Sequence, residues 1–222
     1  MATTIYSGSN DGYCFITGSN WVTIRDADAS TTAVSSGTSY AYGIRASLAT
    51  GRGGTNYAIG RSFLEFDVSG ITHVPKSGTL EVRGHTFGVA DVVAVKGTQS
   101  ASLGTADFDA IDGWDGSSAD GSGAGSNATN VTVYGATISS WSTTGYNSFT
   151  LTEQALVDIA GLATLKICLI EEDMDLRDST PTAPAGEINY AGLRFSEYSS
   201  TGSDPKLIIT EQDNSVFFGT NF

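Results

Sequence analysis

Short segments in which apolar and polar residues alternate recur along most of the chain. In residues 79–87, Leu80 and Val82 fall on one face and Glu81 and Arg83 on the other, which is typical of a strand with one buried face. Clusters of Gly, Ser, Asn and Asp between the segments favour tight turns. The pattern predicts strands over residues 12–17, 21–25, 40–49, 58–68, 79–87, 92–97, 130–137, 148–152, 164–171, 188–195 and 206–211.

One segment repeats its apolar residues at helical spacing instead. In residues 152–161, Leu156 and Ile159 lie three apart and Thr152 is suited to cap the N-terminus of a helix. A shorter helix is predicted over residues 105–111. Many short strands with one short helix favour an all-β fold, a single jelly-roll-like antiparallel β-sandwich.

The domain organisation that follows is simple. Residues 1–211 are expected to form the sandwich, and the Gly- and Ser-rich residues 112–130 one long surface loop, because strand patterns continue on both sides of it. Residues 212–222 form a C-terminal tail. Its aromatic residues are Phe217, Phe218 and Phe222. Since aromatic side chains in a tail are poorly placed in water, we expect them to pack on the domain or to dock into a partner.

The charge balance restricts the partners. The chain of 222 residues has 24 acidic and 11 basic residues and a formal charge of −13. Nucleic acid is not an expected partner, because phosphate binding depends on Lys and Arg. No stretch reaches the length of a membrane span, so no membrane insertion is expected. The charge is compatible with metal cations, neutral glycans or a basic protein.

The first 15 residues and the composition point to different compartments. Those residues have neither the basic nor the apolar region of a secretory signal, which predicts synthesis in a host cytoplasm. The acidic, Lys-poor composition, rich in Gly, Ser and Thr, is typical of extracellular proteins. A virion protein released by lysis satisfies both observations, and so does an extracellular protein whose signal has been removed.

Reactive side chains do not form a catalytic pattern. Cys14 and Cys168 lie in separate predicted strands, where two buried free thiols are the simpler interpretation and a disulfide is the alternative. His73 and His85 lack an accompanying nucleophile motif, so both are read as surface histidines. The acidic residues in 171–175 are adjacent in sequence and are read as a solvated loop. No catalytic residues are predicted.

Calcium is the cation that the acidic residues favour, since it prefers six to eight oxygen ligands. The spacing is not that of an EF-hand, and a flexible acidic loop is the alternative. The predicted metal-site residues are Asp107, Asp109, Asp112 and Asp115. An alternative site consists of Glu171, Asp173 and Glu187.

Aromatic residues near turns are candidates for stacking on sugars. Trp114 lies in the acidic loop, and Tyr40, Tyr42 and Tyr57 lie near predicted turns. An aromatic residue in such a place either offers a flat apolar platform or packs as a lid on the core. We therefore name these four as the predicted glycan-binding residues.

Several stretches together carry a family resemblance. They are "IGRSFLEFDVSGI" at residues 59–71, "SGTLEVRG" at 77–84, "ISSWSTTGYNSFTLTEQALVDI" at 138–159 and "FSEYSSTGSDPKLIITE" at 195–211. Their order resembles a jelly-roll module of the disaggregatase-related type, itself similar to carbohydrate-binding modules. Similar modules occur in phage virion proteins, fibres and decorations. Within the first motif, Arg61 and Asp67 are candidates to pair.

Three functions compete on this evidence. The favoured one is a non-catalytic virion structural protein of a bacteriophage, such as a capsid decoration or cement protein, head fibre or tail appendage. It implies other virion proteins as partners, a homo-oligomer, and adhesion to a host-surface or environmental glycan. The alternative is a free extracellular carbohydrate-binding module. A hydrolase is the least supported, because it needs convergent reactive groups.

Overall fold

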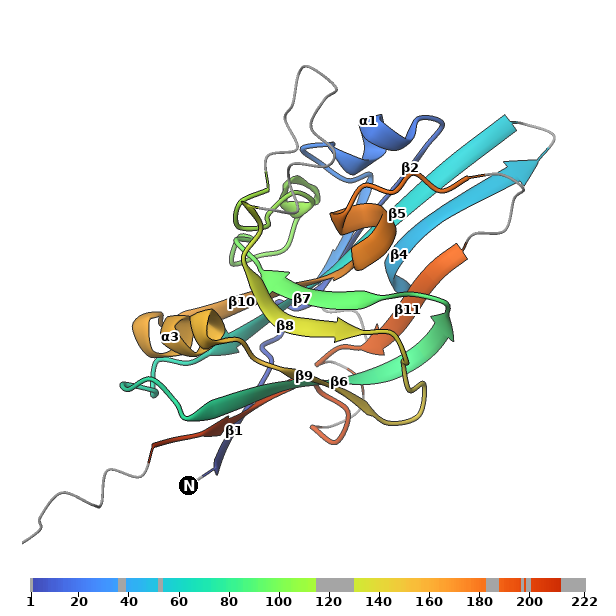
Figure 1. Cartoon of the computed structure of the whole chain (residues 1–222). Coiled ribbons are helices and arrows are strands. Elements are labelled where there is room, and N and C mark those ends of the chain that lie inside the picture. The colour runs from blue at the N-terminus through green and yellow to red at the C-terminus, as the bar shows by residue number, and fades with distance from the viewer. Residues whose placement is uncertain are drawn as a thin grey trace, which may run out of the picture.

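The computed structural model is an all-β antiparallel fold with one helix of more than two turns (Figure 1), which confirms the predicted fold class. It describes residues 2–35, 39–51, 54–114, 130–182, 188–196, 198 and 201–212. The strands are β1 (Ala2–Tyr6), β2 (Gly12–Gly18), β3 (Thr32–Ser35), β4 (Ser39–Gly51), β5 (Gly54–Asp67), β6 (Ser77–Gly88), β7 (Val92–Lys96), β8 (Val133–Ile138), β9 (Tyr146–Thr150), β10 (Thr164–Glu171), β11 (Ile188–Arg194) and β12 (Lys206–Thr210). β1 and β3 were not predicted.

The described strands form one sheet that curls back on itself. Its order is β1-β12-β6-β11-β4-β5-β10-β7-β8, with β2 and β3 attached beside β5 and with β9 paired to β6. An isolated antiparallel bridge joins Gly135 of β8 to Leu151, which directly follows β9. The bridge brings β8, at one end of the path, next to β9, which branches from β6. As a result, β6 and β9 face β7 and β10 across the interior (Figure 1).

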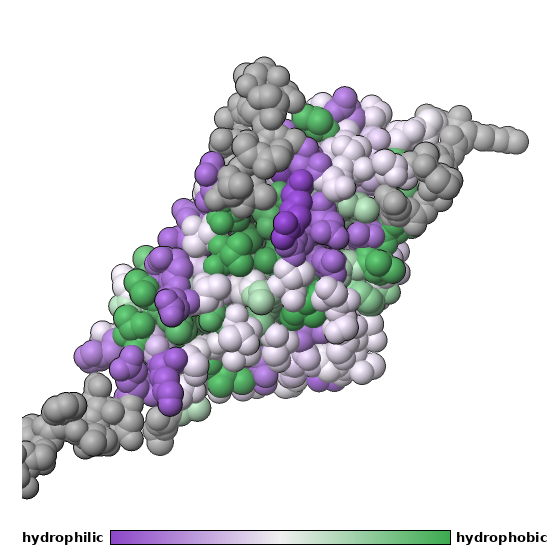
Figure 2. All heavy atoms as spheres, viewed as in Figure 1, coloured by the Kyte–Doolittle hydropathy of each residue, from purple (hydrophilic) through white to green (hydrophobic). Residues whose placement is uncertain are grey.

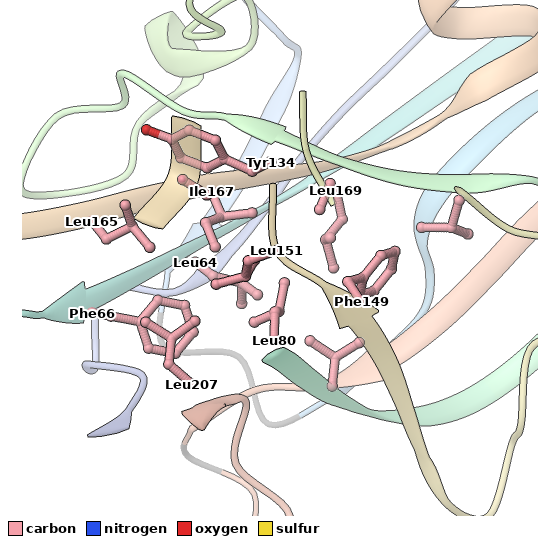
Figure 3. Packing of buried hydrophobic residues seen from close by; sticks show 14 of the residues in the cluster. Leu64, Phe66, Leu80, Tyr134, Phe149, Leu151, Leu165, Ile167, Leu169 and Leu207 are labelled. Carbon is pink, nitrogen blue, oxygen red and sulfur yellow. The ribbon is translucent and has the colours of Figure 1, made fainter. Parts of the chain in front are cut away.

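The interior of the curled sheet is filled by apolar side chains from opposite sides (Figure 3). Leu64 and Phe66 of β5 meet Leu80 of β6, Phe149 of β9 and Ile167 of β10, and each is at most 1% exposed. Leu80 lies on the face of its strand that the alternating pattern predicted to be buried, and so does Val82. Apolar burial on this scale is the main stabilising contribution to the fold.

A second apolar cluster covers the outer face of β5, β10 and β7. Phe63, Cys14 and Cys168 lie in it together with Trp21 and Phe108. These strands are thus buried on both faces, which explains why β10 is almost continuously apolar. Both cysteines are buried free thiols, as the simpler interpretation predicted.

The helical segments are short. Helix α3 (Glu153–Gly161) begins where predicted, and the Thr152 hydroxyl accepts a hydrogen bond from the backbone N–H of Ala155. The predicted strand at residues 21–25 is wrong: it is helix α1 (Trp21–Arg25), because the Asn20 side chain accepts from Thr23 N and caps it.

Two further segments have a single helical turn each. The helix predicted over residues 105–111 is reduced to a 3₁₀ turn, η1 (Thr105–Asp107), and a π-helical turn, η2 (Glu172–Leu176), follows β10. Together with α1, these turns pack over the outer apolar cluster through Phe108, Leu176 and Trp21.

Candidate functional site

A group of aromatic side chains lies on the sheet face formed by β2, β4 and β11. We call it the aromatic strip. It consists of Tyr13, Phe15, Tyr40, Tyr42 and Tyr190, with Arg45 among them. Gly60 of β5, which pairs with Phe15 and Arg45 of the strip, lies on the same face of its strand as Leu64 of the interior core. The strip therefore lies on the interior face of the sheet, next to the enclosed core. Figure 1 shows β4 and β5 extending away from the curled part of the sheet there.

The register of the paired strands determines which residues of the strip lie side by side. Phe15 lies opposite Gly60, Gly60 lies opposite Arg45, and Arg45 lies opposite Tyr190. Four neighbouring strands therefore present one lateral row. Tyr190 in turn lies opposite Gly88 of β6.

Two glycines make this row sterically feasible. A Cβ at Gly60 would lie 2.6 Å from the carbonyl oxygen of Tyr42, in the bulged part of β4 where its register with β11 shifts. A Cβ at Gly88 would lie 2.4 Å from the Tyr190 ring. Only a residue without a side chain permits such close approach.

The rings contact one another in a continuous series. Tyr13 and Tyr40 stack with ring centroids 3.9 Å apart and planes 1° apart. Tyr40 meets Tyr42 edge-on at 6.1 Å, and Tyr42 meets Tyr190 edge-on at 4.9 Å. These are favourable aromatic geometries, so the strip is pre-ordered. Tyr42 is 37% exposed, and the other rings are half-buried.

Arg45 supplies the charge of the strip. Its guanidinium lies 4.9 Å from the Tyr42 ring centroid and 5.8 Å from that of Phe15. Its Nε donates to the Ser47 hydroxyl at 2.7 Å. Burial raises the pKa of Tyr13 and Tyr40 and lowers that of Arg45, which as an arginine stays protonated at neutral pH.

Of the four predicted glycan-binding residues, the structure brings together only Tyr40 and Tyr42. Tyr57 packs 5.8 Å from Trp21 in the outer cluster. Trp114 also packs there, with its ring 4.2 Å from the guanidinium of Arg61 and 4.7 Å from that of Arg25. Trp114 is therefore a lid on buried charges, which is the alternative named for it above.

Beneath Trp114 lies a buried ion pair. Arg61 binds Asp175 through two hydrogen bonds, of 2.9 and 2.7 Å, and both side chains are fully buried. Arg61 also donates to the backbone oxygens of Phe108 and Arg25, so it joins η1, η2 and α1 to β5. The expected pair with Asp67 is wrong, because Asp67 is exposed and accepts from Ser69.

Glu171, the last residue of β10, is fully buried next to Asp175 of this ion pair. Its carboxylate accepts from the backbone N–H groups of Met174 and Asp175 and from the Asn189 amide. Burial raises the pKa of Glu171 to about 7, although these hydrogen bonds act in the opposite direction. Since its acceptors are occupied, we assign it to holding η2 in place.

The predicted calcium ligands do not converge in the described chain. Asp107 accepts from Ser100 and from the backbone of Gly104, and Asp112 accepts from Thr132. Among the described residues, no group of three or more His, Cys, Asp or Glu side chains is arranged so that it could hold a metal ion. Asp115 lies outside these residues, and so does Glu187 of the alternative site.

One surface hollow lies over β7 and β8. Figure 2 shows apolar residues gathered over β7 and β8, beside strongly polar ones. Val133, Leu176, Glu172 and Arg177 line a hollow there, and its two charged groups form an ion pair with each other. His85 is exposed on β6, away from this hollow.

The remaining predictions concern the tail and the membrane. Phe217, Phe218 and Phe222 lie outside the described residues, as does most of the loop predicted at residues 112–130. Over the part of the chain that is described, no helix has the length and apolarity needed to cross a membrane.

No family model matches the chain, and a comparison with curated proteins finds no relative. The resemblance to disaggregatase-related modules therefore stays a prediction.

Sequence reasoning missed four members of the strip: Tyr13, Phe15, Tyr190 and Arg45. One signal was present, because residues 13–16 are apolar or aromatic on both faces of their strand. A strand apolar on both faces either is buried on both or presents one face to a ligand.

Proposed function

We propose that this chain is a non-catalytic recognition module that binds glycans through the aromatic strip, and that it does so on the surface of a bacteriophage particle. There it would act as a capsid decoration or cement protein, head fibre or tail appendage, in contact with other virion proteins and with copies of itself.

The observation that carries the proposal is the lateral row of Phe15, Arg45 and Tyr190 across neighbouring strands, with Tyr42 beside it. Ring faces and edges supply flat apolar surface, and tyrosine hydroxyls supply hydrogen bonds at its border. Because strand pairing holds the rings, little side-chain entropy remains to be lost on binding. A sugar polymer, whose rings have apolar faces and polar edges, fits such a surface.

A non-catalytic role is supported by the use of the buried polar groups. The carboxylates of Asp175 and Glu171 are occupied by Arg61, Asn189 and backbone N–H groups. An active site needs reactive groups that converge on a cleft. The acidic, Lys-poor composition supports an extracellular or particle-surface setting.

The alternative proposal is a free extracellular carbohydrate-binding module. It uses the same strip but requires no multimer and no virion partner. The two proposals therefore differ in assembly, whereas they agree on the binding face.

Gel filtration with light scattering, combined with affinity electrophoresis in polysaccharide gels with and without calcium, tests both. An oligomer that is retarded by a polysaccharide supports the virion proposal. A monomer that is retarded supports the free module. A chain that no polysaccharide retards contradicts the glycan-binding function in either setting.

A further inference from the structure

We infer that the glycan bound by the aromatic strip is anionic, with a sugar carboxylate held by Arg45. This inference rests on the proposed function and specifies its ligand class: a uronate-containing polysaccharide.

The position of Arg45 carries the inference. Its Nε is occupied by Ser47, at 2.7 Å, which fixes the guanidinium plane. The rings of Tyr42 and Phe15 lie 4.9 and 5.8 Å from its central carbon. The N–H groups on its two terminal nitrogens have no acceptor among the described residues. A carboxylate matches the two N–H groups that such a terminal pair directs outward.

The electrostatic surroundings distinguish Arg45 from the arginines of the outer cluster. Arg61 is paired with Asp175, and Arg25 with Asp26. Arg45 has no carboxylate within ion-pair distance in the described chain, and the ionisable side chains that influence it are those of Tyr42 and Tyr40. Since a partly desolvated charge without a counter-ion is unfavourable, a ligand carboxylate would relieve this cost.

The overall charge of −13 does not oppose this assignment at close range. Exposed charges more than about 8 Å apart are largely screened at physiological salt. Local contacts therefore decide where a uronate chain binds, and Arg45 combines a positive charge with two rings of the strip, those of Tyr42 and Phe15.

The test uses the full chain and three polyuronates, namely alginate, polygalacturonate and polyglucuronate, each beside its methyl-esterified form. Affinity is measured by calorimetry for the wild type and for Arg45→Gln, Arg45→Lys and Tyr42→Ala. Arg83→Gln is the matched control, since Arg83 also lies over a tyrosine, Tyr146, but on β6. Thermal unfolding verifies that each variant is folded.

We expect at least one polyuronate to bind, and both its esterification and Arg45→Gln to weaken binding about tenfold or more. The affinity of Arg45→Lys should lie between those of Arg45→Gln and the wild type, because lysine keeps the charge but lacks the paired N–H groups of the guanidinium. The affinity of Arg83→Gln should match that of the wild type. If esterified and free forms bind equally and only Tyr42→Ala weakens them, the strip binds glycans but the anionic ligand is wrong. If no polyuronate binds in either form, the anionic ligand is wrong; the proposed function is wrong as well if the polysaccharide gels also show no retardation.

Discussion

Arg61 and Asp175, which lie 114 residues apart in the chain, form a bidentate ion pair whose two side chains are completely buried. The pair joins the strand β5 to the turn η2, and Trp114 covers it. Burying two charges is expensive, and the cost is offset only when every donor has a partner. Arg61 comes close to this condition, because each of its three guanidinium nitrogens donates and four of its five N–H groups are bonded to Asp175, Phe108 and Arg25.

The change Asp175→Asn should therefore strongly destabilise the protein, because it leaves the Arg61 charge buried and uncompensated. Loss of one partner of a buried pair costs about 3–5 kcal/mol. Urea unfolding measures the change. The control is Asp67→Asn, which alters an exposed carboxylate on the same strand and should leave the midpoint almost unchanged; equal shifts in the two variants would contradict the assigned pairing.

The raised pKa of Glu171 predicts that the stability of the protein depends on pH. Its pKa rises from 4.5 to about 7 on folding, so between these values the folded state binds more protons than the unfolded state. The free energy of unfolding should therefore fall as pH rises from about 4.5 to about 7, by up to about 3 kcal/mol. Glu171→Gln should remove this part of the dependence, because Gln does not titrate.

Urea unfolding at several pH values in that range tests the prediction on wild type and variant. The unfolding free energy of Glu171→Gln minus that of the wild type should increase as pH rises, because only the wild type loses the contribution of Glu171. A constant difference would show that the Glu171 carboxyl titrates alike in both states.

Trp114→Ala should separate stability from binding. The change removes the ring that covers Arg61 and Arg25, and we expect a loss of about 2 kcal/mol or more. Because Trp114 lies outside the aromatic strip, the folded variant should bind polysaccharide as the wild type does. If the variant keeps its stability but no longer binds polysaccharide, Trp114 belongs to the binding site, and its assignment as a lid is wrong.

Gly60→Ala tests how the strip is built. The added Cβ would lie 2.6 Å from the Tyr42 carbonyl oxygen, so the β4 bulge must move. Such overpacking costs about 1–3 kcal/mol, and it should displace Tyr42 and weaken polysaccharide binding. Gly70→Ala is the control, because no atom lies within 4 Å of its added Cβ; it should preserve both stability and affinity.

Alternation along single strands was enough to predict most of the sheet, since burial of Leu64, Phe66 and Leu80 follows directly from their spacing. It failed at residues 21–25, where β-favouring side chains form a helix because Asn20 caps it and Trp21 and Ile24 pack on the outer cluster. β1 was missed because its Thr-rich residues are largely exposed.

The candidate site was harder to predict for a different reason. Tyr40 and Tyr42 were found because they lie near a predicted turn, which the sequence shows directly. Tyr13 and Tyr190 join them only through pairing with distant strands, which single-strand patterns do not contain. The same holds for Arg61, whose partner Asp175 is set by the turn after β10.

The most direct test of the aromatic strip as the binding face compares Tyr42→Ala with Tyr6→Ala. Both tyrosines are exposed, at 37% and 43%, but Tyr6 lies on the edge strand β1 outside the strip. Calorimetric titration with the tightest-binding polysaccharide should show affinity reduced about tenfold or more for Tyr42→Ala, equivalent to about 1.4 kcal/mol, and unchanged for Tyr6→Ala. Equal affinities for wild type and Tyr42→Ala would contradict the account.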